Sequence, residues 1–253
     1  MMKMVKSYQN ESDFLGELVR SFNNLDDFYL NSYSRYGCWC YLGLEYNIMG
    51  MDKLYQSAPP VNQVDTFCHH LHNGYECIDI DSRNTLSKNS EKFNLIPEDQ
   101  SNNSKNLCHS RTVDYNLPTL TNQIWLDNKQ SLTNKLVKEA CDSTNIDSCS
   151  SKTCQIELHF VIKMMKWQKS TLLGIENPEM DKFLHVSRGG SFDPNSECKV
   201  VESEKETNNA CCGEFPNAEP YRYIPDKQEC CNSVVYNPQY LTCRNSRRLI
   251  LAI

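Results

Sequence analysis

The chain has 253 residues, with 26 Lys and Arg against 32 Asp and Glu, a formal net charge of −6 and 39% hydrophobic residues. An acidic chain without a basic stripe lacks what a dedicated nucleic-acid binder needs, and no run of about 20 apolar residues is present to span a membrane. Fourteen cysteines, some spaced as CxC or CC, favour a disulfide framework in a secreted protein over a reduced zinc protein, because CxxC pairs are absent.

The N-terminal part predicts one amphipathic helix and carries no signal segment. Residues 1–14 contain no apolar h-region, so we expect that the signal has been removed or lies outside this sequence. Residues 12–25 place apolar side chains on one helical face behind a Ser12 N-cap, and this face is either core or leans on a lipid surface. Asn10 and Asn102 each begin an N-x-S sequon, as expected of a secreted glycoprotein.

Composition and periodicity give the remaining elements. In chain order we expect a long loop over residues 41–60, a helix from about Val64 to Tyr75, a solvated polar insertion over about 78–107, a small β-hairpin around Tyr115–Leu126, and the longest helical segment from Cys154 to Lys169. Beyond Gly190 the composition changes to short-spaced cysteines. This change predicts two domains, one over 1–190 and a cysteine-rich module over 191–253.

Three short motifs resemble the secreted phospholipase A2 family. Residues 36–40, YGCWC, and residues 60–75, PVNQVDTFCHHLHNGY, are similar to the family's YGCxC and PxDxLDxCCxxHDxCY. Residues 149–157, CSSKTCQIE, resemble the CxxxxCxCD at the start of the family's second long helix. The resemblance implies a mainly α, disulfide-linked, phospholipase A2-like helical core with a small β-hairpin, followed by the cysteine-rich module.

The resemblance also implies that the family's catalytic residues are lost. It places Leu71 at the catalytic histidine and His72 at the calcium-binding aspartate. Leucine cannot accept a proton from water, and Ca²⁺ prefers oxygen ligands to an imidazole nitrogen. His70 and His72 cannot replace the base, since neighbouring helix residues point about 100° apart. We therefore expect no enzyme activity, with Tyr75 and Glu157 remaining from the network that orients the family's histidine.

The family's calcium loop is degenerate in this sequence. Its carbonyl donors fall on Trp39, Tyr41 and Gly43, and Tyr41 stands where the family has glycine. We therefore expect no cofactor, although weak Ca²⁺ binding stays open because backbone carbonyls survive side-chain changes. The three histidines of residues 68–72, CHHLH, are interpreted as solvated helix residues, with a transition-metal site as the alternative.

Disulfide pairs can be carried over from the same resemblance. It implies the pairs Cys40–Cys68, Cys141–Cys154 and Cys38–Cys198. Cys149 is then expected to pair with Cys77 or Cys108, and the cysteine left over with one of the five C-terminal cysteines, which would tie the module to the core.

Two of the family's bridges are missing, and each lacks both of its cysteines. Phe67 and Lys163 stand at the positions of one pair, and Gly74 and Ile156 at those of the other. Random misalignment would not remove cysteines in bridging pairs, so the joint loss favours the implied fold. Phe67 and Ile156 are expected to pack where the bridges are lost.

Residues 198–243 contain CC doublets at short spacing, similar to galaxin-like modules of extracellular and mineral-associated matrix proteins. A tail that wraps the first domain is the alternative interpretation. Together the two resemblances imply a secreted, non-catalytic, otoconin-like protein that binds a matrix component, a lipid surface or another protein. Two other hypotheses stay open: a divergent calcium-dependent phospholipase A2 that hydrolyses the sn-2 ester of phospholipids, and a module that binds lipid or a phospholipase without turnover.

Overall fold

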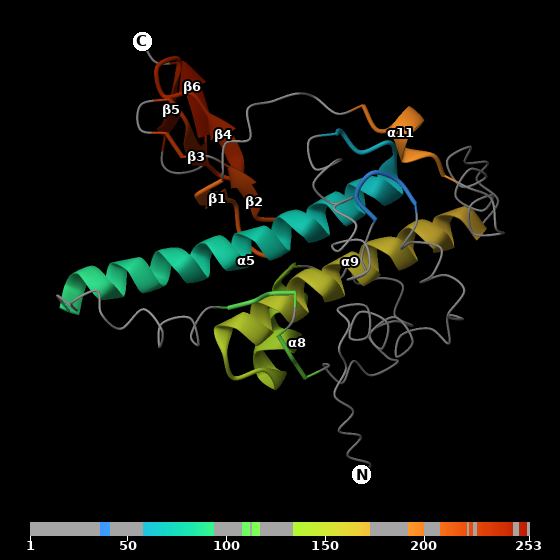
Figure 1. The fold of residues 1–253 in the computed structure, drawn as a ribbon, viewed down its shortest axis with the longest axis horizontal. Coiled ribbons are helices and arrows are strands. Elements are labelled where there is room, and N and C mark those ends of the chain that lie inside the picture. Colours follow the sequence, from blue (N-terminus) through green and yellow to red (C-terminus); the bar gives the residue numbers. More distant parts are fainter. Residues whose placement is uncertain are drawn as a thin grey trace. The chain divides into compact units, whose positions relative to one another are not determined.

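The computed structural model describes residues 36–40, 58–93, 108–111, 113–116, 134–172, 192–199, 208–221, 223–224, 227–244 and 248–251 (Figure 1). Its helices are α5 (Gln63–Phe93), α8 (Asn134–Thr144), α9 (Ser148–Leu172) and α11 (Pro194–Glu197). Its strands are β1 (Ala210–Cys212), β2 (Glu219–Tyr221), β3 (Glu229–Cys231), β4 (Val234–Tyr236), β5 (Leu241–Arg244) and β6 (Arg248–Leu251). The described chain therefore combines helices with small antiparallel strand pairs.

Two compact units make up the chain. The first comprises residues 1–69 and 160–202, and the second residues 70–159 and 203–253. The expected division at residue 190 stays a prediction. The predicted helix over residues 12–25 lies outside the described residues, as do most of the expected 41–60 loop and all but the first two residues of the expected hairpin.

Helix α5 is capped at its start and is longer than the sequence predicted. The side chain of Asn62 accepts a hydrogen bond from the Asp65 backbone N–H at 3.0 Å, which satisfies a donor of the first turn. The helix has 31 residues and ends at Phe93. The prediction that this helix ends near Tyr75 was therefore wrong, since the first part of the expected polar insertion, residues 78–93, continues the helix.

Burial explains why α5 continues. Cys77, Ile78 and Ile80 are each at most 2% exposed, so this stretch belongs to the core despite its polar composition. Gly74 does not end the helix. A Cβ at Gly74 would lie 2.8 Å from Cγ2 of Ile156, so the glycine permits a close approach of α9.

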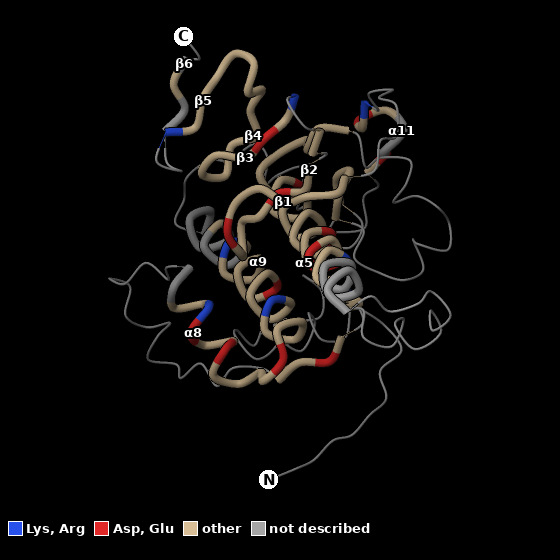
Figure 2. The backbone as a smooth tube through the Cα atoms, turned by 90° about the vertical axis from the view of Figure 1, so that its left-hand side faces the viewer, with Lys and Arg blue, Asp and Glu red and all other residues tan. Residues whose placement is uncertain are grey.

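In the second unit, residues 70–93 of α5 lie beside the first half of α9, and the two run in opposite directions (Figures 1 and 2). Gly74 meets Ile156, and the Lys152 ammonium binds the Asp81 carboxylate at 3.0 Å, so rising numbers on one helix match falling numbers on the other. Helix α9 has 25 residues, so the expectation that it is the longest helix was wrong.

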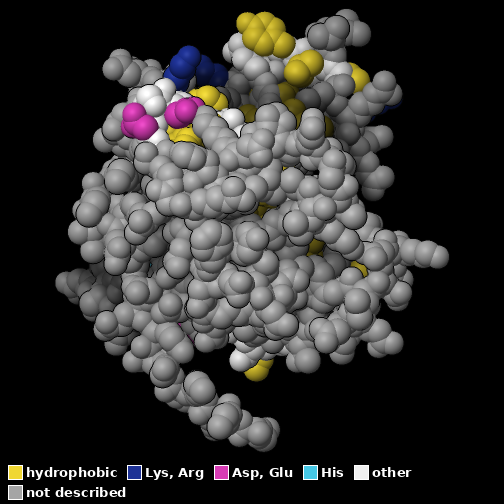
Figure 3. Space-filling model, turned by 90° about the vertical axis from the view of Figure 1, so that its right-hand side faces the viewer, with side chains coloured by type: hydrophobic (Ala, Val, Ile, Leu, Met, Phe, Trp, Pro, Cys, Tyr) yellow, Lys and Arg dark blue, Asp and Glu magenta, His cyan; other side chains and the backbone are white. Residues whose placement is uncertain are grey.

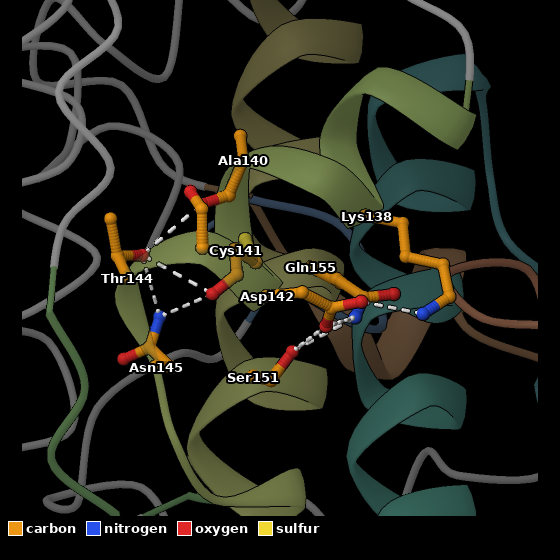
Figure 4. Close-up of polar contacts among 9 residues, drawn as sticks. Lys138, Ala140, Cys141, Asp142, Thr144, Asn145, Ser151 and Gln155 are labelled. Atoms are coloured by element: carbon orange, nitrogen blue, oxygen red, sulfur yellow. Dashed lines mark hydrogen bonds and ion pairs between the residues drawn. The ribbon is translucent and has the colours of Figure 1, made fainter.

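The turn between α8 and α9 is held by polar side chains (Figure 4). The carboxylate of Asp142 accepts hydrogen bonds from Ser151 and Gln155 of α9 and from Lys138 of α8. The hydrogen bond from Lys138 is the main reason that the pKa of Asp142 lies below its ordinary value. These bonds fix α8 against the start of α9.

The C-terminal residues form three two-stranded antiparallel sheets, β1–β2, β3–β4 and β5–β6. The β3–β4 hairpin turns at Asn232 and Ser233, whose φ angles of 47° and 67° match a primed two-residue turn. The bridges Cys212–Cys230 and Cys231–Cys243 link the three pairs in series. Because each sheet has only two strands, the bridges are what hold the module together.

The structure pairs all fourteen cysteines. The three implied pairs Cys40–Cys68, Cys141–Cys154 and Cys38–Cys198 form as predicted. Of the two alternatives left open, Cys149 pairs with Cys108, and Cys77 joins the C-terminal strands through Cys211. This last bridge is the predicted link between the module and the helical core.

Further contacts seat the C-terminal strands on the helices of the second unit. The side-chain amide of Asn208 donates to the Glu76 carboxylate of α5 at 3.0 Å, and the Lys152 ammonium of α9 lies 4.7 Å from the ring centre of Phe215. Exposed hydrophobic side chains are visible at the top of Figure 3, at the height of these strands. Among the described helices, none combines the length and the apolar composition that crossing a membrane requires.

Candidate functional site

In the first unit, the turn formed by residues 36–40 is organised around the buried carboxylate of Asp65. Its Oδ1 accepts the Trp39 N–H at 2.7 Å, and its Oδ2 accepts the N–H groups of Cys38 and Val61, each at 3.0 Å. Desolvation raises the pKa of Asp65, while the N–H donors act against this shift. Asp65 therefore has a structural role at the start of α5.

Gly37 is required in this turn. Its φ of +79° is unfavourable for other residues, and a Cβ there would collide with the Asp65 carboxylate. The bridges from Cys38 to Cys198 and from Cys40 to Cys68 fix the same turn from both sides. The turn is thus rigid because of its backbone donors and bridges.

Of the three carbonyl donors expected for a calcium loop, Trp39 is described, whereas Tyr41 and Gly43 lie outside the described residues. The Trp39 indole donates to the Ala58 carbonyl at 2.9 Å, and its ring centre lies 4.2 Å from that of His69. No group of three or more His, Cys, Asp or Glu side chains is placed to bind a metal within the part of the chain that the structure describes.

The second unit contains the residues that the resemblance places at the catalytic positions. Leu71 is 2% exposed and His72 is 8% exposed. The interpretation of the histidine cluster as solvated was therefore wrong for His72, because the segment around Arg111 covers that face of α5. His70 fits the interpretation better, since its side chain is 35% exposed and its Nε2 lies 3.8 Å from a Glu219 carboxylate oxygen.

Tyr75 and Glu157, which the sequence predicted as a residual network, are brought together by α5 and α9. The Tyr75 hydroxyl donates to Oε1 of Glu157 at 2.6 Å, and the Tyr115 hydroxyl donates to Oε2 at 2.5 Å. Glu157 is 4% exposed, and both hydroxyl donors reduce the free-energy cost of burying its carboxylate. Sequence analysis missed Tyr115, whose position along the chain carries no sign of its proximity to α9.

Arg111 also joins this cluster, although no sequence motif predicted it. One guanidinium nitrogen lies 2.8 Å from Nδ1 of His72, and the guanidinium carbon lies 5.4 Å from the ring centre of Tyr75. Arginine only donates hydrogen bonds, so Nδ1 of His72 must accept, and the imidazole proton is on Nε2. At the position expected for a calcium ligand, the neutral imidazole of His72 therefore accepts a hydrogen bond from the Arg111 guanidinium.

Among the residues that the structure describes, the position that the resemblance assigns to the catalytic histidine supplies no general base to the tyrosine–glutamate network. Leu71 has no titratable group, and both carboxylate oxygens of Glu157 accept tyrosine hydroxyls. Comparisons of the chain with models of protein families, with curated proteins and with solved structures find no match.

Proposed function

We propose that this protein is a secreted, non-catalytic, phospholipase A2-like protein that acts as an extracellular matrix or binding protein. The observation that carries the proposal is the Tyr75–Glu157 hydrogen bond beside Leu71. The resemblance assigns these positions to the orienting network and to the catalytic histidine. A network that retains its supporting residues while leucine replaces the base is what a catalytically silent relative would contain.

The positions of the two missing bridges also support the proposed core. Within the first unit, the Lys163 ammonium lies 6.0 Å from the ring centre of Phe67. Within the second unit, Gly74 is in contact with Ile156. These are the two residue pairs that the resemblance assigns to missing disulfides, and each pair is adjacent. In antiparallel helices, adjacency of one of these pairs entails adjacency of the other, because the positions are equally spaced on α5 and α9, so the two contacts count as one observation that agrees with the proposed core.

The disulfides support the proposed compartment and role. Seven bridges persist only in an oxidising environment, which favours secretion. The bridge from Cys77 to Cys211 presents the C-terminal hairpins on a firm helical support. Extracellular matrix proteins commonly depend on bridged modules of this kind, because such modules have little hydrophobic core.

A turnover assay tests the proposal against the enzyme hypothesis. Phosphatidylcholine and phosphatidylglycerol vesicles would be incubated with the protein, with calcium or with a chelator, and fatty-acid release measured. We expect no release above the buffer blank in either condition. Hydrolysis by the protein that the chelator abolishes would favour the divergent phospholipase instead.

A double variant, Leu71→His with His72→Asp, extends this test. We expect it to stay inactive, because an aspartate at position 72 would face the Arg111 guanidinium and form an ion pair in place of a calcium site. Circular dichroism and thiol counting would show that the variant is folded and fully bridged. Calcium-dependent activity in this variant would mean that the rest of the enzyme site is intact and that Arg111 does not block calcium binding, which contradicts this expectation.

A further inference from the structure

The segment that carries Arg111 is held rigidly on the helices of the second unit. A disulfide joins Cys108 to the start of α9. The Ser110 hydroxyl donates to the Tyr75 carbonyl at 3.1 Å, and the Ser110 N–H donates to Oδ1 of Asp79 at 3.1 Å. Ser110 is 1% exposed, so the backbone next to Arg111 is fixed by buried bonds.

The guanidinium itself is oriented but is only partly used. Its bond to Nδ1 of His72 takes one of five N–H donors, and the ring of Tyr75 lies against its face. Arg111 is half-buried. Among the residues that the structure describes, no carboxylate oxygen lies within 4.0 Å of this guanidinium.

The nearby acids are engaged elsewhere. Oδ1 of Asp79 accepts the Ser110 N–H, and the two carboxylate oxygens of Glu157 accept the hydroxyls of Tyr75 and Tyr115. A partly desolvated cation gains more from a bound anion than an exposed one does, because solvent screens the attraction less. A planar guanidinium whose N–H donors are not all used can bind an oxyanion through two parallel hydrogen bonds.

We propose that Arg111, oriented by His72 and Tyr75, is the centre of a binding site for a phosphate-type oxyanion. The ligand is either a free phosphate group or the phosphate of a lipid headgroup, since both present anionic oxygens that accept hydrogen bonds from the guanidinium. Because the segment and the guanidinium are already ordered, binding costs little conformational entropy. The site stands on the geometry of the second unit and does not depend on the proposed function.

The main competing explanation is that Arg111 only offsets the buried charge of Glu157 through the Tyr75 ring. In that case the guanidinium would matter for stability, but added phosphate would not act through it. A test therefore has to measure binding as well as folding.

Phosphate would be titrated against chloride at matched ionic strength, following the thermal midpoint and the NMR spectrum of the full chain. We expect Arg111→Gln to weaken phosphate binding by about tenfold or more, and Arg111→Lys to weaken it less, because a lysine keeps the charge without the fork. Arg83→Gln is the matched control, since Arg83 is exposed on α5 and its loss changes the net charge equally. Equal phosphate responses in the Arg111→Gln and Arg83→Gln proteins would overturn the proposal.

A measurement on the unmodified protein covers the case in which Arg111→Gln does not fold. Phenylglyoxal modifies accessible arginines, and mass spectrometry would follow Arg111 and Arg83 with and without phosphate. We expect phosphate to protect Arg111 and to leave Arg83 reactive. Equal modification of Arg111 in both conditions would refute the site.

Vesicles distinguish the two sources of the phosphate. Binding to phosphatidylcholine vesicles that contain phosphatidic acid, competed by free phosphate and lost in Arg111→Gln, would assign the site to lipid headgroups. Binding of free phosphate through Arg111 without vesicle binding would assign it to soluble phosphorylated ligands. Failure of both ligands to bind through Arg111 would reject the inference.

Discussion

The contact between Gly74 and Ile156 allows a new disulfide to be designed between α5 and α9. A Cβ placed on Gly74 would lie 3.2 Å from the Cβ of Ile156. Disulfides need a Cβ–Cβ distance of about 3.5–4.5 Å, so the two backbones have to separate by only a few tenths of an ångström. We therefore expect the double variant Gly74→Cys with Ile156→Cys to form a bridge on oxidation.

The expected gain follows from the loop that the new bridge would close. The Cys108–Cys149 bridge shortens the path between the two positions to roughly 40 residues, and closing such a loop is worth about 4 kcal/mol. Replacing Ile156, which is 2% exposed, by cysteine loses about 2 kcal/mol of apolar burial. The oxidised double variant should therefore be about 2 kcal/mol more stable than the native protein.

Peptide mapping without reduction would show the new bridge and confirm that the seven native pairs are unchanged. Denaturant unfolding would then compare the double variant with Ile156→Cys alone, which carries the burial loss without the bridge. Gly74→Ala is a second control and should be destabilised by about 1–3 kcal/mol, because its methyl group has no room beside Ile156. Two free thiols after oxidation would refute the close approach of α5 and α9 at this point.

Two further predictions concern the start of α9 and its buried acid. The side chain of Asp147 accepts the Ser150 N–H at 2.7 Å, and this bond lowers the pKa of Asp147, so Asp147→Ala should cost about 1 kcal/mol at pH 7, measured by denaturant unfolding. The Asp147 side chain stabilises the fold fully at pH values above its ordinary pKa of 3.8, and this stabilisation is lost as the pH falls through its lower folded-state pKa. The difference in unfolding free energy between the native protein and Asp147→Ala should therefore disappear in acid. A difference that stays constant with pH would argue against the helix cap. Tyr115→Phe removes one donor from Glu157 and should cost about 2 kcal/mol, against about 0.5–1 kcal/mol for Tyr236→Phe, whose hydroxyl bonds a less buried glutamate. Equal losses in the two tyrosine variants would show that burial of Glu157 does not strengthen its hydrogen bonds.

The resemblance carried by three short motifs implied the bridges around residues 36–40 and the proximity of Tyr75 to Glu157. These features could be inferred because each depends on a short pattern whose spacing the chain retains. The end of α5 could not be inferred in this way. Ile78-Asp79-Ile80-Asp81 alternates apolar and polar residues with a period of two, which is untypical of a helix, and the following residues are polar.

Arg111 and Tyr115 could not be predicted for a different reason. Both reach the centre of the second unit from a segment without regular secondary structure, held by the Cys108–Cys149 bridge and by Ser110. No periodicity marks such residues, because tertiary contacts alone determine where they lie. The burial of His72 was missed for the same reason, since the group that covers it is 39 residues away in the chain.

The bridge between Cys77 and Cys211 also sets an order in which the protein can mature. The two cysteines are 134 residues apart, and those of the Cys38–Cys198 bridge are 160 apart. At the usual rate of synthesis, Cys77 is made on the order of ten seconds before its partner. Throughout that interval Cys38 and Cys77 lack their native partners, while the bridges confined to the first 154 residues can already close. A chain that ended before Cys198 would therefore leave both cysteines without their native partners, so the two long-range bridges can form only when synthesis is nearly complete.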